Sequence, residues 1–262
     1  MKLYRYILLL AVFAVCLNSC KKSSKPVTPT PTAKKKYLVR VIALDTGYIG
    51  TNVPVTLSNI YYTYDSQKRL STEKGFDKSL TTYAYKDNGD LYSASLTNPD
   101  GTMGGYTEYT YDGGKLQSYK YTSYYNNAIN KETTYTYVYD GNRVSEIHFD
   151  IYYVKFTYDS NGNITREFNY LGSDNFTSVF TYDDKKNRFI NSPLKYPTLT
   201  EIIRPCPNNQ VTVTTEGLQN NILTTTKYTY DSDGYPTAGL TSSDAANTGS
   251  QKFTYIYSTL DD

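Results

Sequence analysis

The sequence predicts an all-β protein: an antiparallel meander of repeated β-hairpins that forms one strongly twisted, rolled or spiral sheet, with a barrel-like closure as one form of it. Two observations predict this fold. A short pattern, an aromatic residue followed by Thr, Tyr and Asp or close variants, recurs along most of the chain. Aromatic residues make up 15% of the chain, and 31 of them are Tyr, a strong strand former.

The repeat is clearest when its units are aligned on their second aromatic residue. This residue falls at Tyr64, Tyr85, Tyr111, Tyr139, Tyr158, Tyr182, Tyr230 and Tyr257. The steps between them are 21, 26, 28, 19, 24, 48 and 27 residues, and we interpret the step of 48 as two units with a degenerate copy at 211–214. Residues 38–44 match the second half of a unit whose first half is missing, and 253–257 match a first half alone.

The residue types within a unit predict one hairpin each. Aromatic-Thr-Tyr alternates with the two-residue period of a strand. The Asp that follows caps a turn through its carboxylate, and the Gly or Asn after it tolerates the positive φ of a short hairpin loop. An apolar residue then begins the return strand, at Leu70, Leu91, Leu116, Val144, Ile164 and Phe189. About seven such hairpins predict fourteen to eighteen strands, more than an open sheet holds without curling.

The first 36 residues predict export and a lipid anchor. Residues 1–19 hold two basic residues and the apolar run 7–16, which is typical of a signal peptide and too short to span a bilayer. Leu17-Asn18-Ser19-Cys20 resembles a lipobox, so Cys20 is the expected lipidation site and the membrane the expected partner. Residues 20–36 are rich in Lys, Pro, Ser and Thr, which predicts a flexible tether that spans about 50 Å if extended.

Charge separates this tether from the domain expected at 37–262. Eight of the 27 basic residues, and no acidic residue, lie in residues 1–36. The other 19 basic residues stand against 25 acidic ones, so the domain carries a net charge of −6. A negative domain is a poor ligand for a phosphate backbone, which excludes nucleic acid as the expected partner. Because no Asp follows Cys20, we expect the outer membrane of the cell envelope, on either its periplasmic or its outer side.

The pattern Tyr-x-Tyr-Asp-x-x-Gly-Arg-Leu resembles that of the YD-repeat, or Rhs-type, family, and this chain is similar to it over residues 38–257. The match is good at the aromatic pair and the Asp. It is looser at the Arg, which stands in the expected place only at Arg69, Arg143 and Arg188. The resemblance implies a curved β-sheet and a place among the small YD-repeat lipoproteins of bacterial envelopes. It implies the fold and not the toxicity of large members of the family.

Residues able to carry catalysis or bind a metal are scarce. His148 is the sole histidine, so a Ser-His-Asp triad or a histidine-rich metal cluster would have to be built around it. Its place in an alternating strand favours a solvent-facing side chain. Cys206 lies between two prolines and favours an inert thiol over a nucleophile activated by His148. The repeated aspartates favour turn capping over calcium binding, because their spacing does not fit an EF-hand. We expect no enzyme activity, no metal and no cofactor.

Two tyrosines that are out of phase with the repeat are the candidate ligand-binding residues. If Tyr62 packs in the core, Tyr61 points to the opposite face, and the same alternation turns Tyr153 away from the core. We hypothesise a non-catalytic, lipid-anchored envelope protein, a binding or scaffold module for a glycan, a peptide or an envelope protein. One alternative is a carboxylate-dependent hydrolase of cell-surface polymers. Another is an immunity-type partner or a remnant of a larger YD-repeat system.

Overall fold

The computed structural model describes residues 34–45, 55–191, 196, 198, 205–217, 221–245 and 249–260. They belong to one compact unit, Lys34–Asp262. The expected signal peptide, the lipidation site Cys20 and all of the expected tether except residues 34–36 lie outside the described residues.

Every regular element in the described ranges is a β-strand, as the sequence predicts. The bounds are β1 Tyr37–Asp45, β2 Val55–Tyr64, β3 Leu70–Lys74, β4 Leu80–Tyr85, β5 Leu91–Thr97, β6 Met103–Asp112, β7 Lys115–Tyr125, β8 Ala128–Asp140, β9 Arg143–Phe149, β10 Tyr152–Tyr158, β11 Ile164–Tyr170, β12 Phe176–Lys186, β13 Asn208–Glu216, β14 Ile222–Tyr230, β15 Pro236–Ser243 and β16 Gln251–Ser258. Within these ranges, no helix is long and apolar enough to cross a membrane.

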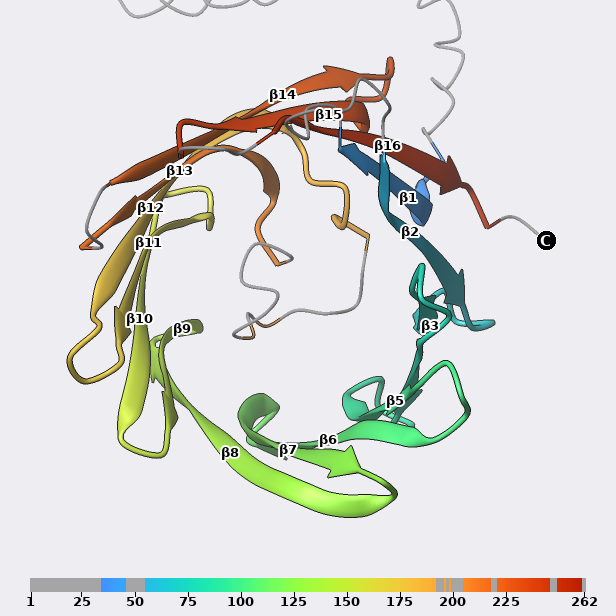
Figure 1. The fold of residues 1–262 in the computed structure, drawn as a ribbon, viewed down its shortest axis with the longest axis vertical. Helices are drawn as coiled ribbons and strands as arrows, with labels where there is room; N and C mark the ends of the chain where they lie inside the picture. The colour runs from blue at the N-terminus through green and yellow to red at the C-terminus, as the bar shows by residue number, and fades with distance from the viewer. Residues whose placement is uncertain are drawn as a thin grey trace, which may run out of the picture. The chain divides into compact units, whose positions relative to one another are not determined.

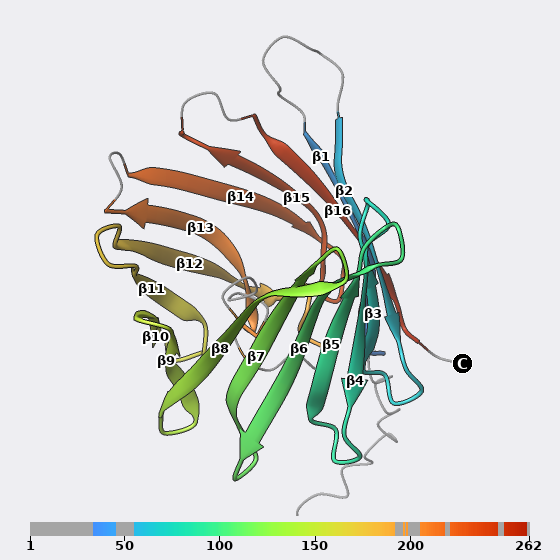
Figure 2. The same ribbon diagram turned by 60° about the horizontal axis from the view of Figure 1, so that its bottom comes forward.

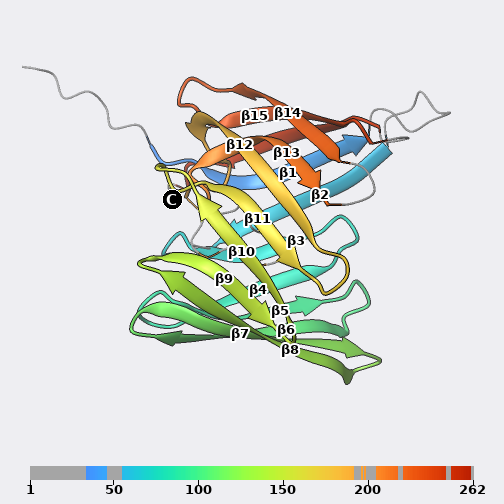
Figure 3. The ribbon, with the colours of Figure 1, turned by 90° about the vertical axis from the view of Figure 1, so that its left-hand side faces the viewer.

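The sixteen strands form one closed barrel. Each strand pairs antiparallel with the next one along the chain, and β1 pairs with β16 to complete the ring (Figure 1). The strands run obliquely around the wall (Figure 3). The predicted all-β meander is therefore confirmed, and the curled sheet takes its barrel-like form.

Three of the repeat aspartates, Asp65, Asp159 and Asp231, lie directly after their strands, in turns where their carboxylates accept hydrogen bonds from backbone N–H groups. Asp112 and Asp140 are the last residues of β6 and β8, and Asp183 lies within β12. Asp65 Oδ1 accepts hydrogen bonds from the backbone N–H of Gln67 and of Arg69, both at 2.9 Å. Asp231 does the same for Tyr235 at 2.9 Å. The turn between β6 and β7 is shorter. Its residues Gly113 and Gly114 have φ of 55° and 77°, a conformation that glycine adopts without strain.

The repeat tyrosines face the interior of the barrel. Tyr137 is buried in a core cluster with Leu116, Val144 and Ile147, and Tyr139 packs against that cluster. The apolar residues that begin the return strands are almost fully buried, with exposed fractions of 1% for Leu70 and 2% for Leu116. The alternation of the strands thus places aromatic rings inside and threonines outside.

Five of the repeat tyrosines link their unit to the one before it through a hydroxyl group. The second tyrosine of a unit donates to the carbonyl of the residue that begins the return strand of the preceding unit. The pairs are Tyr64–Leu38, Tyr85–Leu70, Tyr139–Leu116, Tyr158–Val144 and Tyr182–Ile164, with oxygen–oxygen distances of 2.7 or 2.8 Å. This link meets the need of a buried hydroxyl for a partner and repeats along the wall.

The two half-units at the ends of the chain complete each other. Inside the barrel, the second tyrosine of a unit pairs across the hairpin with its return residue, as Tyr139 does with Val144. Tyr257 in β16 pairs with Leu38 in β1 in the same way. The first half at the C-terminal end and the second half at the N-terminal end therefore form one complete unit that closes the ring.

One interpretation of the repeat is wrong. The step of 48 residues from Tyr182 to Tyr230 is a single unit, because β12 pairs with β13 and β13 with β14. Residues 187–207 are inserted where the other units have a short turn, so Phe189 does not begin a return strand. Instead, the ring of Phe189 packs edge-on against Tyr62 of β2, with centroids 6.1 Å apart. Phe189 also belongs to the buried cluster that contains Leu38 of β1 and Tyr255 of β16. Because these strands are far from the insertion in sequence, the contacts place Phe189 in the barrel interior.

Candidate functional site

A pocket of about 350 Å³ lies on the outer face of the wall where β2 meets the β3–β4 turn. We call it the Tyr61 pocket. Its lining residues are Asn59, Tyr61, Lys74, Gly75, Phe76 and Lys78. β3 ends at Lys74, which pairs with Tyr61, whereas β2 continues to Val55 (Figure 2). The pocket lies beside the part of β2 that extends beyond the end of the shorter strand β3.

Hydrogen bonds within the β3–β4 turn hold Phe76 outward. The N–H of Lys78 donates to the carbonyl of Gly75 at 3.1 Å, and the N–H of Ser79 donates to Asp77 Oδ1 at 2.9 Å. The Ser79 hydroxyl and N–H also hold the pKa of Asp77 below its ordinary value. A Cβ at Gly75 would lie 2.8 Å from Asp77 Oδ1 and from Ser79 Oγ, so a larger residue there would displace these two hydrogen-bonded side chains.

Tyr61 presents its ring at the outer face, with 43% of the residue exposed. The guanidinium carbon of Arg40 lies 4.8 Å from the ring centroid. Arg40 Nε donates to Asn59 Oδ1 at 2.9 Å, and Asn59 Nδ2 donates to the Tyr61 hydroxyl oxygen at 3.3 Å. This chain of contacts fixes the ring orientation and leaves the Tyr61 O–H proton without an acceptor among the described residues.

Apart from Tyr61, the sequence reasoning missed the residues of this site, above all its second aromatic residue, Phe76. It is 60% exposed at the turn between β3 and β4. The available signal was an aromatic residue within a polar, turn-forming segment, Lys74-Gly75-Phe76-Asp77-Lys78, where no strand phase accounts for it.

Tyr153 also lies on the outer face, but its surroundings differ from those of Tyr61. Its ring stacks on His148 of β9, with centroids 5.5 Å apart, and on Tyr170 of β11, with centroids 5.0 Å apart. Neighbouring rings therefore cover both of its faces, which stabilises the wall and leaves little ring face for a ligand. Tyr153 also lies on β10, eight strands from β2 in the ring of sixteen, so the structure does not bring it together with Tyr61 (Figure 1).

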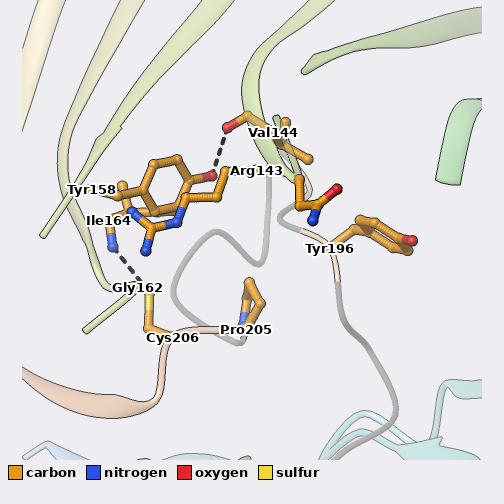
Figure 4. A pocket seen from close by; sticks show the side chains of 9 residues that line it. Arg143, Val144, Tyr158, Gly162, Ile164, Tyr196, Pro205 and Cys206 are labelled. Atoms are coloured by element: carbon orange, nitrogen blue, oxygen red, sulfur yellow. Dashed lines mark hydrogen bonds between the residues drawn. The ribbon is translucent and has the colours of Figure 1, made fainter. Parts of the chain in front are cut away.

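His148 and Cys206 lie on opposite sides of the wall and cannot form a nucleophile–base pair. His148 Nε2 is 2.7 Å from Glu146 Oε2 on the outer face. Cys206 is 2% exposed and packs in the interior cluster, where its sulfur accepts the N–H of Ile164 at 3.5 Å (Figure 4). Burial raises the pKa of the Cys206 thiol, which favours the unreactive protonated form.

A second pocket, of about 170 Å³, surrounds Cys206 between the wall and the insertion. Figure 4 shows Arg143, Tyr158, Tyr196 and Pro205 around it. Arg143 lies over the ring of Tyr158, 5.5 Å from its centroid, and donates to the carbonyl of Asp159 at 3.1 Å. The Arg143 guanidinium, the charged group of this pocket, thus already contacts groups of the protein itself.

Among the residues that the structure describes, the interior carboxylates Glu167 and Glu73 lie too far apart to act as a catalytic pair. Glu167 on β11 is buried and accepts a hydrogen bond from Asn169 at 2.9 Å, and its burial raises its pKa. Glu73 on β3 receives the Tyr83 hydroxyl at 3.3 Å. These strands lie eight apart in the ring, whereas glycosidic hydrolysis needs two carboxyl groups within about 10 Å. Within the described residues, no group of three or more His, Cys, Asp or Glu side chains could hold a metal ion.

Comparison with known proteins shows similarity in fold. No protein-family model matches the chain, and no curated protein matches it in sequence. Among solved structures, it is similar to a porin-like protein from Bacteroides uniformis, at 17% identity and a TM-score of 0.57, over 84% of this chain and 96% of that one. A porin-like protein from Bacteroides vulgatus matches at 11% identity and a TM-score of 0.54, over 86% and 100%. A TcdB2–TccC3 structure matches with a TM-score of 0.26, which is too low to support an argument. The comparisons thus support the barrel fold and nothing finer.

Proposed function

We propose that this protein is a non-catalytic binding module of the bacterial cell envelope, tethered by a lipid on Cys20, whose barrel stands in water and binds its ligand at the Tyr61 pocket. The observation that carries this proposal is that two exposed aromatic rings and two lysines line one pocket on the outer wall. The expected ligand is a glycan, a peptide or an envelope protein.

The outer wall is polar, which supports a barrel outside the bilayer. Threonines pair across neighbouring strands, with hydroxyl oxygens 2.7 Å apart for Thr63–Thr72 and 2.6 Å apart for Thr181–Thr212. Opposite charges pair as well: Lys155 Nζ lies 2.9 Å from Glu146 Oε1. A transmembrane barrel instead carries an outward apolar band about 25 Å tall.

Among the described strand residues, exposed apolar side chains have charged neighbours, which does not favour such a band. Leu240 is 46% exposed on β15 and pairs with Lys227 on one side and Lys252 on the other. Val138 is 42% exposed and pairs with Glu146. Lipid contact at these positions would bury charged neighbours, at a cost of several kcal/mol each near the bilayer centre.

The expected lipobox and tether account for how such a barrel would stay at the membrane. A lipid on Cys20 would supply the anchor, and the extended tether would hold the barrel away from the surface. The porin-like structural neighbours are compatible with an envelope location. The resemblance to small YD-repeat lipoproteins suggests the same location in the cell envelope.

Comparing Tyr61→Ala with Tyr153→Ala on a glycan and peptide array tests the binding role. We expect Tyr61→Ala to lose the ligand signal with little change in thermal stability. Tyr153→Ala keeps the signal but lowers stability by about 1 kcal/mol, because it removes two stacked ring contacts. If Tyr61→Ala kept the ligand signal, the Tyr61 pocket would not be the binding site.

A further inference from the structure

We infer that the ligand of the Tyr61 pocket is a saccharide that carries a carboxylate. This inference rests on the binding role proposed above and adds the chemical class of the ligand. Its observations are the two exposed rings, the net positive charge of the lysines at the pocket and the pocket size.

The rings of Tyr61 and Phe76 provide the apolar part of recognition. Both belong to the pocket lining and are exposed, by 43% and 60%. The face of an aromatic ring is electron-rich, so it packs well against the polarised C–H bonds on one side of a pyranose ring. The outward-held Phe76 and the Arg40-fixed Tyr61 present such surfaces without rearrangement.

Lys74 and Lys78 provide positive charge that the turn neutralises only in part. Neither lysine forms an ion pair with a carboxylate of the described residues, but Asp77 of the same turn, whose carboxylate accepts hydrogen bonds from Ser79, keeps its negative charge, so two lysines stand against one aspartate. Lys120 on the wall, by contrast, is paired: its Nζ lies 3.1 Å from Glu132 Oε1. Two free ammonium groups beside two rings, in a domain of net charge −6, select a ligand with a local negative charge.

Hydrogen-bonding groups in the pocket fit a hydroxylated ligand. Because Asn59 donates to the Tyr61 hydroxyl oxygen, the Tyr61 O–H is available to donate to a sugar oxygen. The lysines offer further donors, each with three N–H bonds.

The pocket size favours a saccharide over a protein partner. A volume of about 350 Å³ lies at the small end of the range of about 300–1,000 Å³ for small-molecule sites. A stable protein interface instead covers about 800 Å² on each partner. A carboxylate on a sugar ring places charge and C–H surface within the reach of one such pocket.

Calorimetric titration of the full-length lipidated protein in detergent micelles tests the inference. The probes are a short oligogalacturonate, the uncharged galactose oligomer of equal length, and an oligoglutamate of equal charge. We expect the oligogalacturonate to bind at least about fivefold more tightly than either, because two exposed ion pairs and ring stacking act on it together. Its affinity falls as salt is added.

Variants locate the interaction. Lys74→Gln/Lys78→Gln loses about fivefold or more in affinity for the oligogalacturonate, and Phe76→Ala loses affinity for both sugars. The control Lys155→Gln/Lys227→Gln removes the same charge from distant strands and leaves binding unchanged. Thermal unfolding of each variant shows that the barrel is intact.

Three results would overturn the inference. Equal binding of the uncharged oligomer removes the need for a carboxylate, and equal or tighter binding of oligoglutamate makes the ligand an acidic peptide. In both cases the pocket keeps its binding role if Tyr61→Ala abolishes the signal. Absence of oligogalacturonate binding to the folded protein also rejects the acidic sugar, whereas the array comparison of Tyr61→Ala judges the binding role separately.

Discussion

Leu38, in the first strand, pairs with Tyr257, in the last, in the register that each internal hairpin uses between its second tyrosine and its return residue. Leu38 is 2% exposed, as is Leu116, which begins a return strand on the other side of the barrel. The closure of the ring is therefore built like an internal hairpin, although its two halves come from opposite ends of the chain.

Leu38→Ala tests whether the closure is as firmly packed as the internal units. Removing a fully buried leucine side chain costs about 2 to 5 kcal/mol. We expect Leu38→Ala and the matched control Leu116→Ala to lower the free energy of unfolding by similar amounts in urea titrations. A loss near zero for Leu38→Ala alone would mean that the ends of the chain do not close the ring in solution.

Tyr139→Phe tests the hydroxyl link between successive units. The Tyr139 hydroxyl donates to the Leu116 carbonyl at 2.7 Å, and its removal leaves that acceptor without this donor. We expect a loss of about 1 kcal/mol in the free energy of unfolding. The control is Tyr125→Phe, at a tyrosine that is 72% exposed, and it should change stability little. Equal effects of the two substitutions would deny the link an energetic role.

The turn aspartates predict a loss of stability in acid. Partial burial pulls the pKa of Asp65 upward, but hydrogen bonds from Arg69 outweigh it, and the pKa of Asp65 is lowered. The pKa values of Asp159 and Asp231 are lowered as well, against the same effect of burial. A carboxylate with a lowered folded-state pKa stabilises the protein above its unfolded value of about 3.9, and this stability is lost as pH falls through the folded value.

Urea titrations between neutral pH and pH 3 measure this effect. The wild type should lose stability below about pH 4, and Asp65→Asn should flatten that part of the profile. Ser66→Ala, in the same turn, carries no titratable change and should keep the wild-type slope. An unchanged slope in Asp65→Asn would show that this turn does not contribute to the acid sensitivity.

Cys206 should be inert to alkylation in the folded protein. It is buried against Ile164 and Tyr182, and burial raises the pKa of its thiol. We expect iodoacetamide to modify it slowly at neutral pH and rapidly after unfolding in urea, as followed by mass spectrometry. Rapid modification of the folded protein would indicate that the insertion opens and exposes the thiol.

Much of the fold follows from local sequence. Aromatic-Thr-Tyr alternation, the turn aspartate and the following Gly or Asn specify each hairpin from within about ten residues, and they were read correctly at Tyr64, Tyr139 and Tyr158. The number of strands and the orientation of the tyrosines follow from the same pattern.

The remaining features depend on contacts between distant parts of the chain. Leu38 pairs with Tyr257, and Phe189 packs on Tyr62. These residues are far apart in sequence, so the local alternation of residue types does not predict their contacts. The sequence predicts a degenerate unit after Tyr182 because the insertion there is about as long as a repeat. The alternation along the strand predicts that Tyr61 faces outward. Its pocket, however, depends on where β3 ends beside the longer β2, which the sequence does not show.

Fractionation of cells that express the Cys20→Ser variant tests the proposed tethered barrel most directly. Without its lipid, a barrel with a polar outer wall should leave the membrane pellet, stay soluble without detergent and keep a β-sheet circular dichroism spectrum, while the wild type partitions into the detergent phase. A Cys20→Ser protein that stays folded in the membrane and resists extraction at alkaline pH would contradict the account, because the wall itself would then be embedded in lipid.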